Sequence, residues 1–483
     1  GPATTSPGEP AASSARRSAR PTSSWPPSAA GVDGGATTAR VDTTTFIPFF
    51  TDRSVSDNPT SFTLQQDASL DSETDGPPPH SFYLDSYSNL DFTWQIDDGD
   101  LRLYDDDGSE QAIATAVAVT GSVTFDGLFD IISADVTAGT DINLNADMTV
   151  SGPVDAFNLS AGNAVVQAPG TSVDAGASAI DIAAGPGGVA VGQLITADTS
   201  DNAIDIATGG AITDADAAPG DDLVAASGGV MLTATTGIGT TAEPIGTRTD
   251  RVVFINTTSG DVVFANDNAG APLMLGSIAP TGNFGGGQTV LSNASPITID
   301  HALFFEGDVT ISAIGDPGVA GDDITLDTAG TISLTSAVDR MLTLNAGDDI
   351  IFSNQIVTGG GGTHSVYLNA GTEATPSLDG VPGSIAYGPT PPVPYAVIAD
   401  ALMIDAPGRV IDSGRALKFY VLVSQLTATT GDEQNFNIGS PGLTALNLQS
   451  TGGVVTVFTD GSILDSDGSI DIHASRDNGP SDE

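Results

Sequence analysis

One short phrase recurs along this chain and constrains its fold more than any other feature. It consists of Gly or a small residue, one or two Asp or small polar residues, and then alternating apolar residues. Residues 321–326, 330–334 and 347–352 are three copies in close succession. Alternation with a period of two, punctuated by Gly and Asp, is typical of short strands that bury one face. Because Gly, Thr and Asp are poor helix formers, their density argues against helices, and the chain is expected to be all-β.

The spacing of the phrase predicts how the strands are arranged. Measured between first apolar residues, three steps are 24, 26 and 26 residues, namely Ile180 to Ile204, Ile204 to Val230 and Ile324 to Ile350. Two longer steps of 47 and 104 residues are near two and four such units, namely Val262 to Val309 and Ile350 to Val454. Steps of 38, 32, 15 and 16 residues elsewhere fit no single period. A period of roughly 20–30 residues made of short strands indicates a solenoid, and we predict a parallel β-helix. An irregular β-sandwich array is the alternative.

The composition is strongly acidic and free of cysteine. There are 13 Lys and Arg against 61 Asp and Glu, giving a formal net charge of −48, and Lys418 is the single lysine. Such a charge disfavours binding to nucleic acid and to anionic membrane surfaces. Without cysteine, disulfides, thiol catalysis and cysteine-ligated zinc sites are excluded. No apolar run approaches the roughly 18 residues that suggest a transmembrane helix, so no transmembrane segment is expected.

Changes in composition divide the chain into segments. Residues 1–45 are rich in Pro, Ser, Thr and Gly and are expected to form a disordered leader, because they bury too little apolar surface. Strand-like phrases fill residues 111–375 and return over 398–475, which we predict to be the β-helix and its continuation. The proline-rich residues 376–397 are expected to be a loop or linker, because Pro cannot take part in a central ladder. Residues 476–483 are a polar tail.

Residues 46–110 differ from the rest in their aromatic content. An open solenoid end exposes apolar interior and unpaired strand edges, so we predict that this segment is an N-terminal β cap. Residues 90–104, with a turn at Asp97-Asp98-Gly99, fit a β-hairpin. A carbohydrate-binding surface on Trp94 and the nearby tyrosines is an alternative role for the segment.

A longer composite phrase runs through residues 237–264. Gly237-Ile238-Gly239 and Glu243-Pro244-Ile245 precede a strand, a Ser-Gly turn and the phrase at 260–264. This phrase resembles the coil repeats of large bacterial exoproteins, the filamentous-haemagglutinin-like adhesins with β-helix repeats, over about residues 135–360 and 440–475. The resemblance implies a right-handed parallel β-helix, a secreted or cell-surface location and an adhesive or structural role. The Asn-Pro-Asn-Gly-type secretion motif of two-partner haemagglutinins is missing, since Asn58-Pro59 is followed by Thr60.

Clusters of aspartate are the candidate metal ligands. Oxygen-rich turns suit Ca²⁺, and like charges stacked about 4.8 Å apart in neighbouring coils are unfavourable unless screened or bridged. The best clusters supply Asp97, Asp98, Asp100, Asp105, Asp107, Asp465 and Asp467. None completes a known calcium loop, and solvated turn acids are the alternative. The four histidines are scattered without metal-ligand spacing.

A catalytic interpretation rests on two aspartate pairs that the 26-residue step places one coil apart. Pectinase-type β-helix enzymes use Asp groups on one face, with one acid protonated and one activating water. The candidates are Asp322, Asp323, Asp348 and Asp349. A polysaccharide lyase also needs a basic residue, and the few in the later coils are Arg340, Arg409, Arg415 and Lys418. These aspartates also stand before strands, where turns favour Asp.

The sequence therefore favours a structural or adhesive scaffold without catalysis, secreted or at the cell surface. The expected partners are other copies of the chain, assembling end to end or laterally into filaments, or cell-surface glycans or proteins, and not nucleic acid. A polysaccharide-active β-helix enzyme, either a hydrolase or a lyase, and a calcium-dependent binding module are the alternatives. Residues 1–20 lack the apolar segment of a signal peptide, so the location is an expectation from the architecture.

Overall fold

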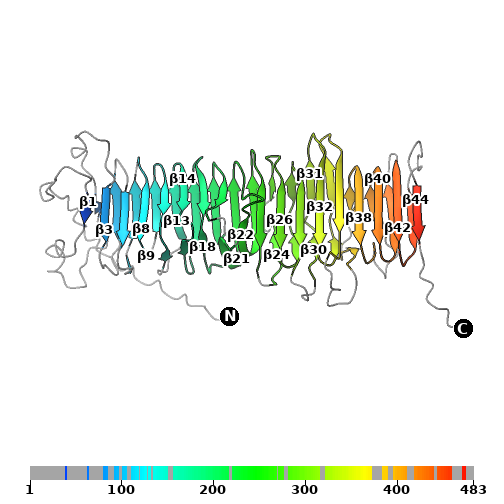
Figure 1. The fold of residues 1–483 in the computed structure, drawn as a ribbon, viewed down its shortest axis with the longest axis horizontal. Helices are drawn as coiled ribbons and strands as arrows, with labels where there is room; N and C mark the ends of the chain where they lie inside the picture. Colours follow the sequence, from blue (N-terminus) through cyan, green and yellow to red (C-terminus); the bar gives the residue numbers. More distant parts are fainter. Residues whose placement is uncertain are drawn as a thin grey trace, which may run out of the picture.

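A computed structural model of the chain shows a long row of stacked strands (Figure 1). It describes residues 120–459, except for 128, 132–133, 151–155, 217–219, 269, 277–280, 316–320, 373–382, 390–394, 411–417 and 440–442. Beyond this range it describes the strands β1–β7 and β44. Every regular element of the described residues is a strand, and all pairings between these strands are parallel. The prediction of an all-β parallel solenoid is confirmed; its handedness and the N-terminal cap stay predictions.

In the first half, from β5 to β19, each coil contributes one strand to each of three faces. Face one contains β2 (Thr63–Leu64), β4 (Phe92–Ile96), β7 (Ile113–Ala118), β10 (Ala134–Ala138), β13 (Ala156–Ala161), β16 (Ala179–Ala184) and β19 (Ile204–Thr208). Face two contains β1 (Thr38–Arg40), β3 (His80–Leu84), β5 (Leu101–Asp105), β8 (Val123–Gly127), β11 (Ile142–Leu144), β14 (Ala164–Gln167), β17 (Gly188–Val191) and β20 (Ile212–Asp214). Face three contains β6 (Glu110–Gln111), β9 (Phe129–Ile131), β12 (Met148–Val150), β15 (Ser172–Asp174) and β18 (Gln193–Ile195).

At two long strands in the middle of the solenoid, the way in which strands are distributed among the faces changes. β21 (Leu223–Ala234) and β22 (Ile245–Asn256) have 12 residues each, and each spans face three and face one; β21, for example, pairs with both β18 and β19. β23 (Val262–Asn266) joins face two to face three, because Val262 pairs with Ile238 and Phe264 pairs with Ile245. Face one divides at the same level, since β22 pairs with both β24 (Leu273–Leu275) and β25 (Thr281–Asn283).

In the second half, the strands keep this new arrangement of one joined face and two faces derived from face one. The joined face continues through β26 (Thr289–Asn293), β29 (Val309–Ala313), β32 (Arg340–Ala346), β35 (His364–Asn369), β38 (Ala401–Ala406), β40 (Gln425–Thr430), β42 (Ala445–Ser450) and β44 (Ile470–Ala474). One product of the division contains β27 (Ile297–Ile299), β30 (Ile324–Leu326), β33 (Ile350–Phe352) and β36 (Ile385–Tyr387). The other contains β28 (Leu303–Phe305), β31 (Ile332–Thr335), β34 (Ile356–Gly359), β37 (Val397–Ile398) and β39 (Phe419–Leu422). These two faces join at β41 (Gln434–Gly439) and β43 (Val455–Thr459).

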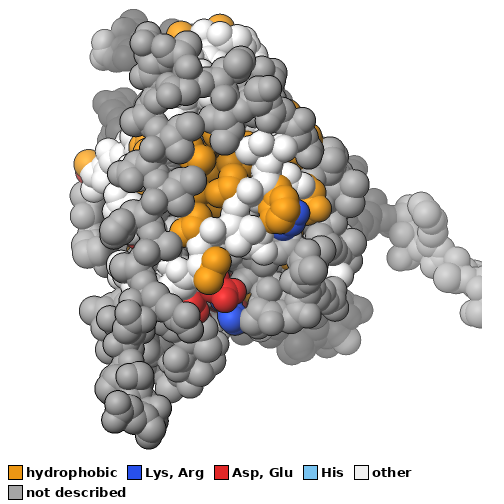
Figure 2. Space-filling view, turned by 90° about the vertical axis from the view of Figure 1, so that its right-hand side faces the viewer, with side chains coloured by type: hydrophobic (Ala, Val, Ile, Leu, Met, Phe, Trp, Pro, Cys, Tyr) orange, Lys and Arg blue, Asp and Glu red, His pale blue; other side chains and the backbone are white. Residues whose placement is uncertain are grey.

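The core is a continuous apolar filling along the axis. Alternate residues of each strand point inward and are buried, as in the pattern of β29, and hydrophobic side chains gather at the centre of the C-terminal end (Figure 2). Phenylalanine rings pack against one another inside the core: ring centroids are 5.7 Å apart for Phe254 and Phe264 and 5.4 Å apart for Phe352 and Phe419. Each fully buried Phe stabilises the fold by roughly 1.5–3 kcal/mol relative to an exposed one.

Buried polar side chains are concentrated around β22 to β26, where the arrangement of the faces changes. They are Thr247, Thr249, Asn256, Asn266, Asn268, Thr281, Asn283, Thr289, Asn293 and Ser295. Two asparagine ladders organise them, with Nδ2–Oδ1 distances of 2.9 Å from Asn256 to Asn283 and 2.8 Å from Asn266 to Asn293. Amides that donate and accept in this way satisfy backbone groups at the new corners, which an apolar side chain would leave unpaired.

The predicted coil spacing is confirmed. Ile180 pairs with Ile204, Ile204 with Val230, and Ile324 with Ile350. The step from Ile350 to the 454 region spans four coils, through Ile385, Val410 and Gln434 to Val455, one residue beyond the predicted marker. The same ladder crosses the proline-rich residues 376–397, so the β-helix is continuous on both sides of them.

One sequence interpretation needs correction. The hairpin predicted over residues 90–104 is wrong: β4 pairs in parallel with β7, whereas β5 pairs in parallel with β3 and β8. These two strands lie on different faces of the coil, and residues 97–100 between them lie outside the described residues. β1 lies within the predicted leader, and the remainder of residues 1–45, like the tail 476–483, lies outside the described residues.

Candidate functional sites

The aspartates predicted as a catalytic pair do stack. Asp323 and Asp349 immediately precede β30 and β33, whose residues pair directly, and the backbone N–H of Asp349 donates to the Asp323 carboxylate over 3.0 Å. In the next coil the backbone N–H of Ser384 donates to the Asp349 carboxylate over 2.6 Å, and Arg409 follows one coil further on. Asp323, Asp349, Ser384 and Arg409 therefore form one row along the axis, which we call the Asp323 row.

Carboxylates elsewhere at the corners make the same kind of bond. An Asp side chain accepts a backbone N–H from the following coil at distances of 2.8–3.1 Å in Asp141 with Ala164, Asp147 with Ser172, Asp261 with Gln288, Asp308 with Met341 and Asp339 with Thr363. A charged acceptor makes such a bond stronger than a neutral one does. The acidity of the corners thus has a structural cause, because each carboxylate extends the inter-coil ladder into the turn that precedes a strand.

The neighbouring Asp322 is oriented differently. Its side chain is 1% exposed, and its Oδ2 accepts the backbone N–H of Gly315 over 3.1 Å. Oδ1 has no hydrogen-bond partner among the residues that the structure describes. Asp348, in the equivalent position one coil later, is also buried. Asp322 and Asp348 therefore face inward, and only Asp323 and Asp349 of the predicted set are on the accessible side of the corner.

Two carboxyl groups have raised pKa values. Burial raises the pKa of Asp222 to about 7, against the effect of the Gly246 N–H that it accepts over 2.7 Å, and nearby Asp214, Asp216 and Asp221 add to the rise. Burial and the carboxylate of Asp181 in the preceding coil raise the pKa of Asp205 to about 6. Both groups are thus partly protonated near neutral pH.

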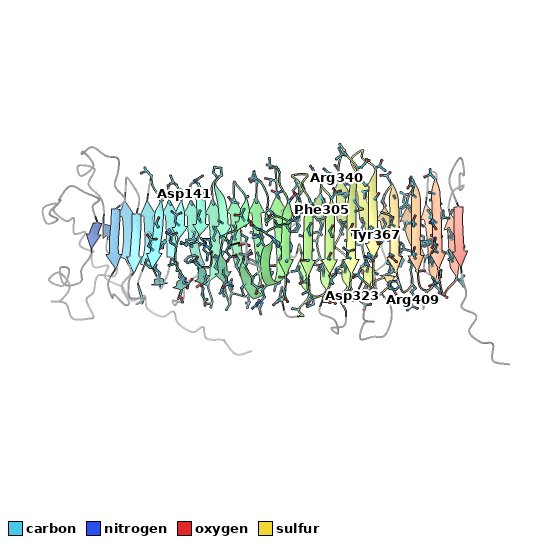
Figure 3. The ribbon with its side chains drawn as sticks, viewed as in Figure 1. Asp141, Phe305, Asp323, Arg340, Tyr367 and Arg409 are labelled. Atoms are coloured by element: carbon cyan, nitrogen blue, oxygen red, sulfur yellow. The ribbon has the colours of Figure 1, made fainter. Side chains whose placement is uncertain are left out.

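Two of the basic residues predicted for a lyase, Arg340 and Lys418, have side-chain contacts with local partners. Arg340 lies 3.5 Å from the Asp308 carboxylate and donates to the Gly286 carbonyl over 3.4 Å. Arg340 and Asp323 lie at opposite edges of the molecule in the view of Figure 3. The Lys418 ammonium lies 2.8 Å from the centroid of the Phe458 ring. Arg415 is outside the described residues. Of the three that the structure describes, only Arg409 lies in the Asp323 row, where its backbone N–H donates to Ser384.

The predicted calcium ligands are not tested by the structure. Asp97, Asp98, Asp100, Asp107, Asp465 and Asp467 lie outside the described residues, and Asp105 is described only as the last residue of β5. Within the parts of the chain that are described, no three His, Asp or Glu side chains are arranged to hold a metal ion. Calcium binding therefore stays a prediction for the segments around residues 97–107 and 465–467.

Sequence analysis overlooked several buried polar groups. His364 is fully buried and its Nε2 lies 2.9 Å from the Gly359 carbonyl. Tyr387 accepts the Tyr420 backbone N–H over 2.8 Å, and burial raises the pKa of its hydroxyl. The asparagine ladders were also missed. An Asn at the end of two aligned strands, such as Asn266 and Asn293, is the signal that could have indicated them.

Comparisons with protein-family models, with curated proteins and with solved structures gave no match. The resemblance to haemagglutinin-type exoproteins therefore rests on the repeat phrase. None of the described segments forms a helix long and apolar enough to cross a membrane.

Proposed function

We propose that this chain is a structural or adhesive scaffold, secreted or displayed at a cell surface, that acts without catalysis. The observation that carries the proposal is the continuous ladder from β3 to β44, in which each coil pairs with the next along the axis. A solenoid of this kind is stabilised by contacts between neighbouring coils and presents extended flat faces. It suits a role in which length and repeated surface positions matter more than one enclosed pocket.

Adhesion is tested directly with the full chain coupled to inert beads. Beads are flowed over surfaces coated with cell-surface polysaccharides, with glycoproteins or with albumin, and the retained fraction is measured. Retention on at least one polysaccharide or glycoprotein surface above the albumin level is expected. Equal retention on all surfaces would leave the chain without its adhesive role.

Assembly into filaments is a second part of the proposal, motivated by the stacked architecture. Near the C-terminal end of the solenoid, Val454 just before β43 and Phe458 within β43 are 64% and 46% exposed. Electron microscopy of the purified chain over a range of concentrations should show rods that lengthen as concentration rises. Monodisperse single rods at the highest concentration would contradict filament assembly and leave adhesion untouched.

The Asp323 row supports one alternative, a polysaccharide-active enzyme. Carboxylates in successive coils with Arg409 in the same row are the residue types that such chemistry uses. A screen of neutral and acidic glycans for new reducing ends or unsaturated products, with Asp323→Ala and Asp349→Ala as controls, separates enzyme from scaffold. Product formation abolished by both substitutions would favour the enzyme.

A further inference from the structure

One outer face of the second half carries little charge at its centre and many hydroxyl and amide groups, in contrast to face one of the first half. The outward side of β29, β32, β35, β38, β40 and β42 is a continuous six-strand surface that we call the polar face. At the two central outward positions of each strand it carries one acidic residue, Asp405, and no basic residue. The central outward column of face one is different, since it includes Asp135, Asp181 and Asp205.

Hydroxyl and amide groups predominate on the polar face. Asn345 donates to Ser312 over 3.1 Å, and Asn369 donates to Asn345 over 3.3 Å, so three consecutive coils are linked along the axis. Each primary amide has two N–H donors and a carbonyl oxygen with two lone pairs. One bond along the ladder fixes the orientation of the amide and leaves donor and acceptor capacity directed away from the sheet.

Tyr367 supplies an aromatic ring in the middle of this surface. It lies directly between Thr343 and Met403 in the neighbouring coils and is partly exposed (Figure 3). Partial burial, and then Asp405, raise the pKa of its hydroxyl above the ordinary value of 10.0. Like any tyrosine hydroxyl, it is a donor at neutral pH. A tyrosine ring offers an apolar face together with a polar edge.

We propose that the polar face binds a neutral polysaccharide chain that runs along the solenoid axis. Neighbouring strands are about 4.8 Å apart, so six of them offer equivalent hydrogen-bonding positions over about 24 Å. Uncharged hydroxyls match the amides and hydroxyls of this face, and the C–H side of a sugar ring matches Tyr367. A polyanion would be repelled by the net charge of −48, and a cationic partner would find more carboxylates on face one.

This inference rests on the adhesive role proposed above, and it is tested with the full chain by affinity electrophoresis. The gels contain a soluble β-glucan, mannan or arabinoxylan as neutral probes, or polygalacturonate as the anionic probe. The variants are Tyr367→Ala, which removes the ring, and Thr427→Arg, which places a long side chain on the exposed centre of the face. Thr149→Arg, at an exposed outward position of β12, is the matched control.

At least one neutral polysaccharide should retard the chain. Tyr367→Ala and Thr427→Arg should weaken that binding about ten-fold or more, corresponding to the ~1.4 kcal/mol of one aromatic contact, whereas Thr149→Arg should leave it unchanged. Binding that neither variant weakens would overturn the assignment of this face and leave adhesion standing. Retardation by polygalacturonate alone would overturn the neutral class. No retardation by any polysaccharide, with bead retention on glycoprotein intact, would overturn the inference while the scaffold proposal survives.

Discussion

The backbone N–H of Asp349 donates a hydrogen bond to the carboxylate of Asp323, one coil earlier, over 3.0 Å. The same carboxylate-to-amide bond recurs at corner after corner along the axis. It explains why a chain with 61 acidic residues places so many of them immediately before strands. Their repulsion is offset where each carboxylate accepts a backbone donor that would otherwise lack a partner at the turn.

Replacing Asp323 should measure the value of this bond. Asp323→Ala leaves the Asp349 N–H without its acceptor and should lower the free energy of unfolding by about 1–3 kcal/mol. Asp323→Asn keeps an oxygen at the same place and should cost less than half as much. Denaturant unfolding of both variants, with the exposed Glu306→Ala as control, decides the matter. Equal losses for Ala and Asn would show that the hydrogen bond is not the cause.

Replacing an asparagine of the ladder between Asn266 and Asn293 should lower the free energy of unfolding more than replacing Asp323. Asn266 accepts from Thr247 and from the Thr249 backbone N–H, and donates to Asn293 over 2.8 Å. Asn266→Ala should lower the free energy of unfolding by about 3 kcal/mol, because several buried groups lose partners together. Asn143→Ala, which removes one part-buried bond to Thr124, should cost under about 1 kcal/mol. A small loss for Asn266→Ala would contradict a structural role for the ladder.

Stability should depend on pH through Asp222. Its pKa of about 7 in the folded chain lies above the ordinary value of 3.8, so the folded state binds the proton more tightly than the unfolded state. The contribution of this group is therefore most favourable below pH 4 and is lost as pH rises to 7. Asp222→Asn removes the ionisation. It should raise the free energy of unfolding at pH 8 by a few kcal/mol at most, and Tm with it, while changing Tm little at pH 4. Thermal unfolding at both pH values tests this, and an unchanged Tm at pH 8 would refute it.

Core and surface phenylalanines should respond differently. Phe419 is fully buried and its ring packs against Phe352 and Phe436. Phe419→Ala should cost about 3–5 kcal/mol. Phe458→Ala removes a half-exposed ring with Lys418 above it and should cost about 1 kcal/mol. Urea unfolding of the two variants provides the comparison, and similar losses would place Phe419 outside the core.

The sequence predicted the coil well and its faces poorly. The period of the phrase depends on apolar residues that stack directly, such as Ile180 on Ile204, and this signal is local and repeated. The steps of 38 and 15 residues had no explanation because the phrase begins strands on different faces: Ile142 is on face two, whereas Ile180 is on face one. Whether two faces join, as at β23, depends on the corners at which the chain changes direction. The sequence does not identify those corners, because similar Gly-Asp turns occur at all of them.

The candidate sites show the same limit. The 26-residue step was sufficient to place Asp323 beside Asp349, because these residues directly precede the aligned pair Ile324 and Ile350. It did not by itself place Asp322, but the period-two alternation of the following strand, extended back from Ile324 through Asp323, would have predicted its inward position. The hairpin over residues 90–104 failed because Asp-Gly turns connect successive faces of a solenoid as readily as they reverse a chain.

Stacking of like positions is tested most directly by engineered disulfides, since the chain contains no cysteine. Ser160 is paired with Ala183, and Thr429 with Gln449, and all four residues are exposed. Cysteines at either pair should form an intramolecular disulfide under mild oxidation, detected by mass spectrometry. In the offset controls Ser160/Ala179 and Thr429/Ala445 the second cysteine lies four residues away along the same face, about 13 Å off register, and should stay reduced. Equal oxidation of aligned and offset pairs, or oxidation of the offset pairs alone, would contradict the stacked parallel coils.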